Sequence, residues 1–375
     1  MVATVVAPHM ADSGHLFASG RTLFAEAAVL GIEDQVVRTA RVAGDTIAYS
    51  IVGDGPPLVM GGWWCSHLEL NWQDPRFREF LGPLAARHSV IRFDPPGVGA
   101  SGPAGRTALT VDDGVAGLAG LVEALGLARF DLIGASSGAA AAVAYAARWP
   151  TRLRRLVLYG SFARGVDIAP EAARNALLEV VATHWGLGSR LLADVFVPGS
   201  SAKERAAFAR FQRRSATREQ AGHSLAVTYR TDVTDELTRV RVPTFVVHRR
   251  DDRAVPFALG AEVARRVHRS TFVPLDGIDH FPWRGDASAV ADAMLRGLGH
   301  HVQGRPDRPG PAAITDRERE VLGLVADGLT DQQIADRLTL SRNTVHRHIA
   351  NARTKLGVRS RAAAAAAVAG PARQD

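Results

Sequence analysis

Strand-like and helical patterns of apolar positions alternate along residues 36–159. Strand-like runs, either alternating or continuously apolar, occur at 36–42, 46–52, 57–60, 89–93, 130–133 and 153–159. Helical periodicity of the apolar positions occurs at 111–125 and 137–148. Continuously apolar runs are typical of strands buried on both faces, and strands that alternate with helices form parallel sheets. The pattern therefore predicts an α/β fold with a doubly wound, mostly parallel sheet.

The strand pattern stops at about Arg164. Residues 165–237 instead have helical periodicity, which is strongest near 172–184 and 203–214. Strand patterns then return at 242–248 and 271–275, and helical patterns at 258–267 and 287–298. A helical insertion between two strands of a sheet is how a lid is built over a pocket. We therefore expect residues 165–237 to form a helical lid.

Composition divides the chain further. Residues 1–34 predict a flexible extension with a short helix near 23–30. Residues 299–312 are rich in Gly, Pro and Arg, which is typical of an interdomain linker. These limits predict an α/β domain at 35–300 and a separate domain at 313–375.

Composition also limits the class of protein and its cellular location. Its 375 residues are 46% hydrophobic and 22% charged, which is ordinary for a globular protein. No run of 18 apolar residues occurs, so we expect no transmembrane helix and no membrane partner. No Lys or Arg precedes Arg21, which argues against a secretory signal. Cys65 is the only cysteine, which excludes an intrachain disulfide and favours a cytoplasmic location.

Ser136 lies in a candidate nucleophile motif. The stretch Gly134–Gly138 reads G-A-S-S-G, which matches G-x-S-x-G. It follows a predicted strand and opens a predicted helix, and this is the context that a nucleophile elbow needs. Only small residues leave room for the backbone to bend and expose the serine hydroxyl. The alternative is that Ser136 only caps the helix.

A serine hydroxyl becomes a good nucleophile only when an oriented base removes its proton. His280 follows the predicted strand at 271–275 and is the candidate base. Asp252 follows the strand at 242–248 and is the candidate acid, with the adjacent Asp251 as its rival. Carboxyl ends of parallel strands meet at one edge of a sheet, so we expect these side chains to meet Ser136. The spacing to Val255-Pro256 favours Asp252.

An oxyanion hole requires two backbone N–H groups. We expect one from Ser137 and the other from Trp63, which follows Gly61-Gly62. The alternative for Trp63 and Trp64 is packing in the core, and for Trp72 we favour that alternative. We interpret Cys65 as a small buried apolar residue rather than a nucleophile.

Residues 36–300 resemble the α/β-hydrolase family. The stretch Asp94–Ser101 is similar to that family's D-x-x-G-x-G-x-S turn, and Gly61-Gly62-Trp63 is similar to its H-G oxyanion loop, with glycine in place of the histidine. The ending D-H-F-P-W at 279–283 resembles a bacterial subgroup often fused to cyclase or regulatory domains. The resemblance implies a Ser–His–Asp hydrolase, but this fold alone does not specify a substrate.

The carboxyl-terminal domain has the pattern of a small all-α helix-turn-helix. Capping boxes at 315–318 and 330–333 predict the starts of two helices. Ser341 predicts the start of a third, which ends before Gly357, and a fourth begins at about Arg361. Apolar side chains at the spacing of two crossing helices are Ile334, Ala335, Leu338, Leu340, Val345 and Ile349.

Residues 313–369 resemble the helix-turn-helix domain of the LuxR family, through Thr315–Leu322, Ile334–Leu338, Thr344–His348 and Lys355–Val358. The resemblance implies that the third helix binds the major groove of double-stranded DNA. The outward face of this helix is predicted to carry Arg342, Asn343, His346, Arg347 and Ala350. Carried over by position, His346, Arg347 and Ala350 face base edges, while Thr344 and Lys355 contact phosphates.

Two features modify this interpretation. The family usually has lysine at the position of His346 and often a longer side chain at Ala350, so the expected affinity is reduced. Residues 341–375 carry seven Arg and Lys side chains against Asp375 alone, a local charge of +6 in a chain of net +7. Such a run is either a DNA-binding surface or a solvated tail. The alanine run 362–367 is expected to form a dimer contact, so we expect a homodimer.

Two functions follow from the sequence. The first is a DNA-binding regulator whose hydrolase domain senses, and slowly hydrolyses, a small ester or lactone. The second is a working esterase or lactonase that the helix-turn-helix only localises or controls. We favour the regulator, because a purely metabolic hydrolase gains little from binding DNA. We expect no cofactor or metal, and an apolar ligand flanked by Trp63, Phe281 and Trp283.

Overall fold

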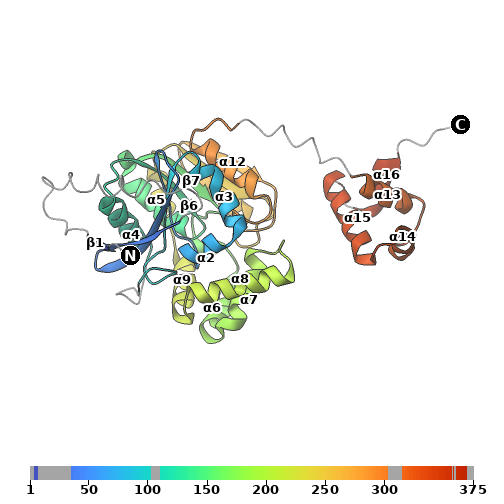
Figure 1. Ribbon diagram of the computed structural model, residues 1–375, viewed down its shortest axis with the longest axis horizontal. Helices are drawn as coiled ribbons and strands as arrows, with labels where there is room; N and C mark the ends of the chain where they lie inside the picture. The colour runs from blue at the N-terminus through green and yellow to red at the C-terminus, as the bar shows by residue number, and fades with distance from the viewer. Residues whose placement is uncertain are drawn as a thin grey trace. The chain divides into compact units, whose positions relative to one another are not determined.

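The computed structural model describes residues 4–6, 35–102, 110–302, 315–356, 358 and 360–369, which form two compact units (Figure 1). One unit extends to His301 and the other begins at Val302, so their boundary falls within the predicted linker. The helix predicted near 23–30 and most of the predicted linker lie outside the described residues. None of the described helices is long and apolar enough to cross a membrane.

A single sheet forms the centre of the first unit. Within the described residues it has nine strands in the spatial order β1-β2-β3-β5-β4-β6-β7-β8-β9. They are β1 (Thr4–Val6), β2 (Val37–Val42), β3 (Asp45–Val52), β4 (Pro57–Met60), β5 (Ser89–Phe93), β6 (Phe130–Ala135), β7 (Leu153–Tyr159), β8 (Thr244–Arg249) and β9 (Ser270–Leu275). Strand β3 is antiparallel to β2 and β5, and the remaining neighbours are parallel. This is the predicted mostly parallel sheet.

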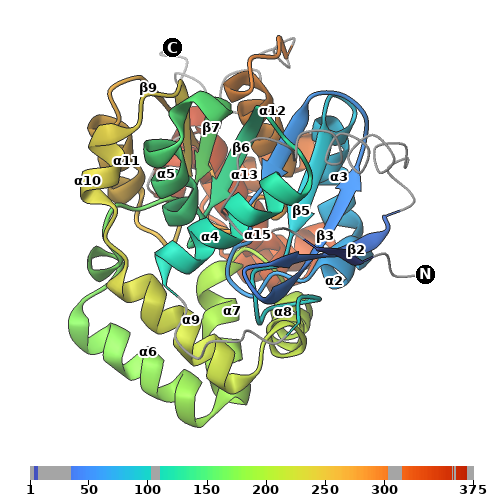
Figure 2. The ribbon, with the colours of Figure 1, turned by 90° about the vertical axis from the view of Figure 1, so that its left-hand side faces the viewer.

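Helices cover both faces of the sheet, as Figure 2 shows. One face is covered by α4 (Val111–Ala124), α5 (Gly138–Arg148), α10 (Thr234–Arg239) and α11 (Phe257–Arg266), and the other by α3 (Pro75–Ala85) and α12 (Ala287–Gly297). The central strands β5 and β6 are buried along their whole length. A fully buried Leu or Ile contributes about 1.5–3 kcal/mol, so these strands hold the edge that carries Ser136 in place.

Among the described residues, one strand and two α-helices were not predicted. Strand β1 lies in the extension expected to be flexible, but it pairs in parallel with the outer strand β2 and extends the sheet. Helices α2 (Leu68–Gln73) and α3 follow the predicted oxyanion loop. Helix α3 buries Phe77, Phe80, Leu81 and Leu84, and Asp74 caps it ahead of Pro75 at its first turn. Its helical spacing and cap were signals in the sequence, although Pro83 inside the helix obscures them.

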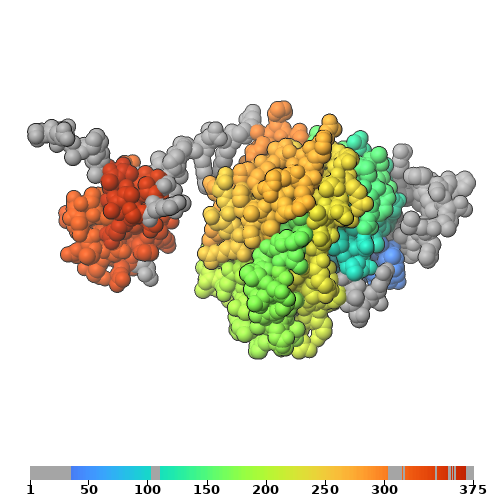
Figure 3. Space-filling model, turned by 180° about the vertical axis from the view of Figure 1, so that it is seen from behind, coloured from blue at the N-terminus to red at the C-terminus, as the bar shows by residue number. Residues whose placement is uncertain are grey.

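The predicted lid consists of helices between β7 and β8. They are α6 (Glu171–Thr183), α7 (Trp185–Phe196), α8 (Ala202–Ser215) and α9 (Arg218–Arg230). In Figure 3 this segment, green to yellow-green, forms one end of the first unit beside the yellow to orange segment that follows it. Helix α10 belongs with the core rather than the lid, because it packs on α5 and α11 and buries Leu237.

The second unit has four described helices: α13 (Asp316–Ala326), α14 (Asp331–Leu338), α15 (Arg342–Leu356) and α16 (Arg361–Ala369). The capping boxes at Thr315 and Thr330 form as predicted, with each threonine accepting a hydrogen bond from the third helical residue. The predicted apolar side chains of α14 and α15 pack with Val321 of α13 in one core. The predicted helix-turn-helix is therefore confirmed.

A pair of histidines lies at the edge of the core of the first unit. His88 precedes β5, His300 follows α12, and their Nε2 atoms are 3.2 Å apart. His88 Nδ1 faces the carbonyl of Leu84, so its Nε2 accepts the hydrogen bond that His300 donates. Burial, followed by the field of His300, lowers the pKa of His88 to about 4. Both rings are therefore neutral at pH 7.

We expect this pair to make the first unit sensitive to acid. Because the pKa of His88 is lower in the folded state than its ordinary value of 6.5, the unfolded chain binds more protons at pH 5. We expect the unit to lose about 1–2 kcal/mol of stability between pH 7 and pH 5 from this residue, after allowance for solvent screening. Urea unfolding followed by tryptophan fluorescence measures it, since all six tryptophans lie between residues 63 and 283.

The variant His88→Asn should lose less stability over the same pH range than the wild-type protein. The exposed His268, replaced by Asn, is the matched control and should leave the pH dependence unchanged. An equally steep pH dependence in His88→Asn would show that other groups cause it.

Candidate active site and DNA-binding helix

Ser136 lies at a sharp turn between β6 and α5. Its φ is 52°, a left-handed conformation that costs a non-glycine residue about 1–2 kcal/mol. A Cβ at Gly134 would lie only 2.6 Å from that of Ala142. A Cβ at Gly138 would lie 2.0 Å from the carbonyl oxygen of Gly62. Only glycine fits at these two positions, and the turn that they allow leaves Ser136 partly exposed.

The structure brings the three predicted catalytic residues into one hydrogen-bonded row. His280 Nε2 lies 2.8 Å from Ser136 Oγ, and His280 Nδ1 lies 2.7 Å from Asp252 Oδ2. Asp252 and His280 are buried, whereas the rival acid Asp251 is exposed. The carboxylate can only accept a hydrogen bond, so Nδ1 carries the proton and the lone pair of Nε2 faces the serine hydroxyl. This is the tautomer that a general base requires.

Local hydrogen bonds keep Asp252 ionised in the interior. Burial alone would raise its pKa, but the His280 imidazole and the N–H of Val255 together hold the pKa of Asp252 below its ordinary value. Its Oδ1 accepts hydrogen bonds from the backbone N–H groups of Ala254 and Val255 at 2.9 and 3.1 Å. A second buried imidazole, His248, lies 3.7 Å from Oδ2, and burial lowers its pKa, which favours the neutral form.

The lid contacts the candidate base directly. The backbone N–H of His280 donates to the carbonyl of Phe196, at the end of α7, at 2.8 Å. The Phe196 ring stacks on the imidazole, with centroids 5.7 Å apart and planes 26° apart. The neighbouring Asp279 accepts a hydrogen bond from Gly199 of the lid at 2.9 Å. No sequence signal pairs Phe196 with His280, because they are far apart in the chain.

The predicted oxyanion donors are available. Within the described residues, neither the Trp63 nor the Ser137 backbone N–H donates a hydrogen bond. The Trp63 ring packs 5.3 Å from Trp283, and the Trp64 ring packs on Phe196. Both indoles are therefore buried. Trp72 is half-buried, and Cys65 is buried, which raises the pKa of its thiol.

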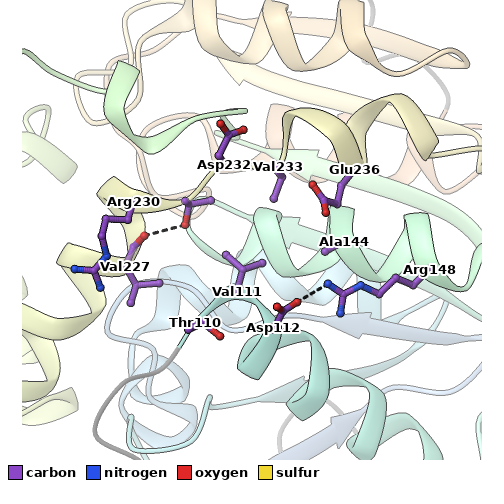
Figure 4. A pocket seen from close by; sticks show the side chains of 11 residues that line it. Thr110, Val111, Asp112, Ala144, Arg148, Val227, Arg230, Asp232, Val233 and Glu236 are labelled. Carbon is purple, nitrogen blue, oxygen red and sulfur yellow. Dashed lines mark hydrogen bonds and ion pairs between the residues drawn. The ribbon is translucent and has the colours of Figure 1, made fainter.

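A hollow of about 310 Å³ lies where the lid rejoins the core (Figure 4). It is lined from α4 and α5 by Asp112 and Arg148, which form an ion pair, and from α9 and α10 by Arg230 and Glu236. None of the three predicted catalytic residues lines it. Its charged wall differs from the apolar pocket that we expect beside Ser136.

Helix α15 presents the predicted DNA-binding positions to solvent. Arg342, His346, Arg347 and Ala350 are exposed, and Thr344 is half-buried, with its N–H bonded to Ser341. The side chains of Asn343 and Lys355 lie outside the described residues. Asp331 of α14 lies 3.7 Å from His346 and 3.0 Å from Arg361, so it links α14 to α15 and α16.

Two families match this chain. Residues 58–293 match the Alpha/beta hydrolase family, and residues 312–368 match Bacterial regulatory proteins, luxR family. Pyrrolizixenacetamide deacetylase of Xenorhabdus hominickii is 27% identical over 240 residues, which cover 63% of this chain and 88% of that protein. The DNA-binding transcriptional activator DevR/DosR of Mycobacterium tuberculosis is 40% identical over 81 residues, 21% of this chain and 35% of that protein.

The fold has solved counterparts. The crystal structure of a hydrolase from Pseudomonas aeruginosa aligns with a TM-score of 0.62 at 23% identity, covering 70% of this chain and 98% of that one. These matches confirm both resemblances predicted from the sequence. The chain belongs to the α/β-hydrolase family and carries a carboxyl-terminal helix-turn-helix domain of the LuxR type.

Proposed function

We propose that this protein is a LuxR-type transcriptional regulator whose hydrolase domain binds a small ester or lactone and slowly hydrolyses it. One observation carries the proposal: a hydrogen-bonded row of Ser136, His280 and Asp252 occurs in the same chain as a complete helix-turn-helix. A fold alone does not imply chemistry, but this geometry is the one that acyl transfer requires.

In the first step, Ser136 Oγ attacks the ester or lactone carbonyl carbon while His280 Nε2 takes the hydroxyl proton. The developing oxyanion accepts hydrogen bonds from the N–H groups of Trp63 and Ser137. Asp252 stabilises the imidazolium and keeps its orientation. The bond from the carbonyl carbon to the leaving oxygen then breaks, and that oxygen takes the proton from His280.

In the second step, water attacks the acyl-serine. His280 removes the proton from the water, the bond from the acyl carbon to Ser136 Oγ breaks, and the proton returns to Oγ. The products are a carboxylic acid and the alcohol released earlier, or a hydroxy acid in the case of a lactone. The rings of Phe196 and Phe281, 5.7 and 5.9 Å from the imidazole, favour an apolar acyl group.

The regulatory half of the proposal rests on the second unit. The LuxR-type domain implies DNA binding, and the exposed cations of α15 can neutralise phosphates. We propose that α15 enters the major groove and that the protein binds as a dimer. The second candidate function, an esterase or lactonase only localised by DNA, is favoured by the complete alignment of the three catalytic positions.

A combined assay of turnover and DNA affinity tests this function. A fluorophosphonate probe should label the wild-type protein, and Ser136→Ala should abolish labelling, because the probe captures only an activated serine. Asp252→Asn should slow labelling far more than Asp251→Asn. Hydrolysis is then measured with p-nitrophenyl acyl esters and acyl lactones, and DNA affinity with and without each compound.

If the protein is a regulator, a compound that it hydrolyses should change its DNA affinity. In the wild-type protein this change should end as the compound is hydrolysed, and in Ser136→Ala it should last longer. Hydrolysis with no change in DNA affinity for any compound identifies the second candidate. If the probe does not label the protein and no compound changes its DNA affinity, both functions are excluded.

Gly160 gives a test of the position of the imidazole. It has φ of 55°, and a Cβ there would lie 2.8 Å from His280 Cε1. We expect Gly160→Ala to displace the imidazole from Ser136 and slow fluorophosphonate labelling strongly. The control Gly44→Ala also has a positive φ, of 93°, but its Cβ would meet nothing within 4 Å. Both should lose about 1–2 kcal/mol of stability from backbone strain, and only Gly160→Ala should be labelled more slowly.

Arg347 gives a test of the DNA-binding helix. If its guanidinium reads a base edge, Arg347→Ala should cost roughly 1–3 kcal/mol on the specific site and less on random DNA. Lys355→Ala should weaken both about equally and flatten the salt dependence, because it removes a phosphate contact. Fluorescence anisotropy at several salt concentrations measures both effects. The proposed orientation of the helix would be wrong if Arg347→Ala left specific binding unchanged while Lys355→Ala altered the base preference.

A further inference from the structure

Arg249, the last residue of β8, is buried inside the hydrolase unit. Its side chain is among the largest that are fully buried, with 1% of its surface exposed. Charged side chains rarely occupy such a position unless their charge is compensated. Within the described residues, no carboxylate oxygen lies within ion-pair distance of its guanidinium. The charge must therefore be compensated by something other than an ion pair.

Backbone carbonyl groups provide the compensation, and all of them belong to the segment 279–286, which holds His280. Nη1 of Arg249 donates to the carbonyls of Asp279 at 2.7 Å and Phe281 at 3.0 Å, on either side of the candidate base. Nη2 faces the carbonyls of Pro282, Arg284 and Asp286. The N–H groups of the planar guanidinium therefore point in fixed directions toward the carbonyl groups of one loop.

The surrounding backbone leaves room for this side chain. Gly277 has φ of 129°, and a Cβ there would lie 3.0 Å from Arg249 Cδ and 3.2 Å from Nε. The loop that follows β9 can therefore pass over the stem of the arginine only with glycine at this position. Arg249 is also three residues before Asp252, whose N–H faces the Arg249 carbonyl at 3.4 Å. One strand end therefore carries both the candidate acid and the anchor of the candidate base.

We infer that Arg249 is a positioning residue, which sets the distance between His280 and Asp252 by fixing the His280 loop to the end of β8. This inference rests on the proposed function. Carbonyl oxygens that lost these donors would turn toward other partners, and the loop would move. The imidazole would then lose its alignment with both Asp252 and Ser136, although the hydrogen bonds of Arg249 go only to the loop and not to Ser136.

The test compares Arg249→Met, Arg249→Lys and the control Arg250→Met. Arg250 is adjacent but exposed, with its Nε 3.6 Å from Asp276. We expect Arg249→Met to slow fluorophosphonate labelling by about 100-fold, as expected for a misplaced catalytic group. Arg249→Lys, which keeps the charge but not the planar fork, should show a smaller loss. Arg250→Met should be labelled like the wild-type protein.

Two measurements separate positioning from a general loss of structure. Labelling is measured at a temperature where tryptophan fluorescence shows each variant to be folded. In the background of Asp252→Asn, Arg249→Met should cause little further loss, because both changes remove the same alignment. Fully additive losses, or wild-type labelling of folded Arg249→Met, would overturn the inference. If Arg249→Met does not fold, wild-type labelling of Arg249→Lys overturns it equally.

A spectroscopic readout keeps this inference distinct from the proposed function. The low-field proton resonance of His280 Nδ1–H, assigned by its absence from His280→Ala, reports the hydrogen bond to Asp252 without any reaction. It should be lost or shifted in Arg249→Lys and retained in Arg250→Met. If the wild-type protein is not labelled at all, the proposed function fails, and this resonance still decides the role of Arg249.

Discussion

The hydrogen bond between His280 Nδ1 and Asp252 Oδ2 determines what the rest of the site can do, because it sets which nitrogen faces Ser136. It joins the loops after two neighbouring parallel strands, β8 and β9, so the register of the sheet decides whether it can form. Removing a carboxylate from water is costly, and a buried pair is tolerated only when the other lone pairs are also bonded. The N–H groups of Ala254 and Val255 meet that requirement.

The imidazole that makes this bond also contacts the lid. His280 is held on one side by Asp252, and on another by the carbonyl and ring of Phe196. A lid that ended one turn earlier would leave the backbone N–H of His280 without this acceptor. The position of α7 and the geometry of the imidazole are therefore parts of one arrangement, and a change in either would alter the other.

The sequence predicted the parts of this arrangement that depend on local pattern. The G-x-S-x-G turn needs small residues at fixed positions, so Ser136 was identifiable, and the spacing of Asp252 to Val255 favoured it over Asp251. Arg249 and Phe196 were not identified, because their roles come from contacts with a loop far along the chain. The one available signal for Arg249 was its position at the end of a strand whose apolar pattern predicts burial. Helix α3 was missed because Pro83 lies inside it and weakens the pattern, and α2 was missed because its six residues are too few to show a helical period.

On the proposed function, hydrolysis and sensing place different demands on one pocket. An enzyme gains rate by binding the transition state better than the substrate, whereas a ligand shifts a conformational equilibrium only by its difference in affinity for two states. Contact between Phe196 and His280 would then give the lid a way to supply that difference, because an acyl group bound to Ser136 would lie near the imidazole on which the lid ring stacks. Hydrolysis then replaces an apolar ester with a carboxylate, whose desolvation among Phe196 and Phe281 is unfavourable. The reaction would thus end the signal by making its own ligand a poorer fit.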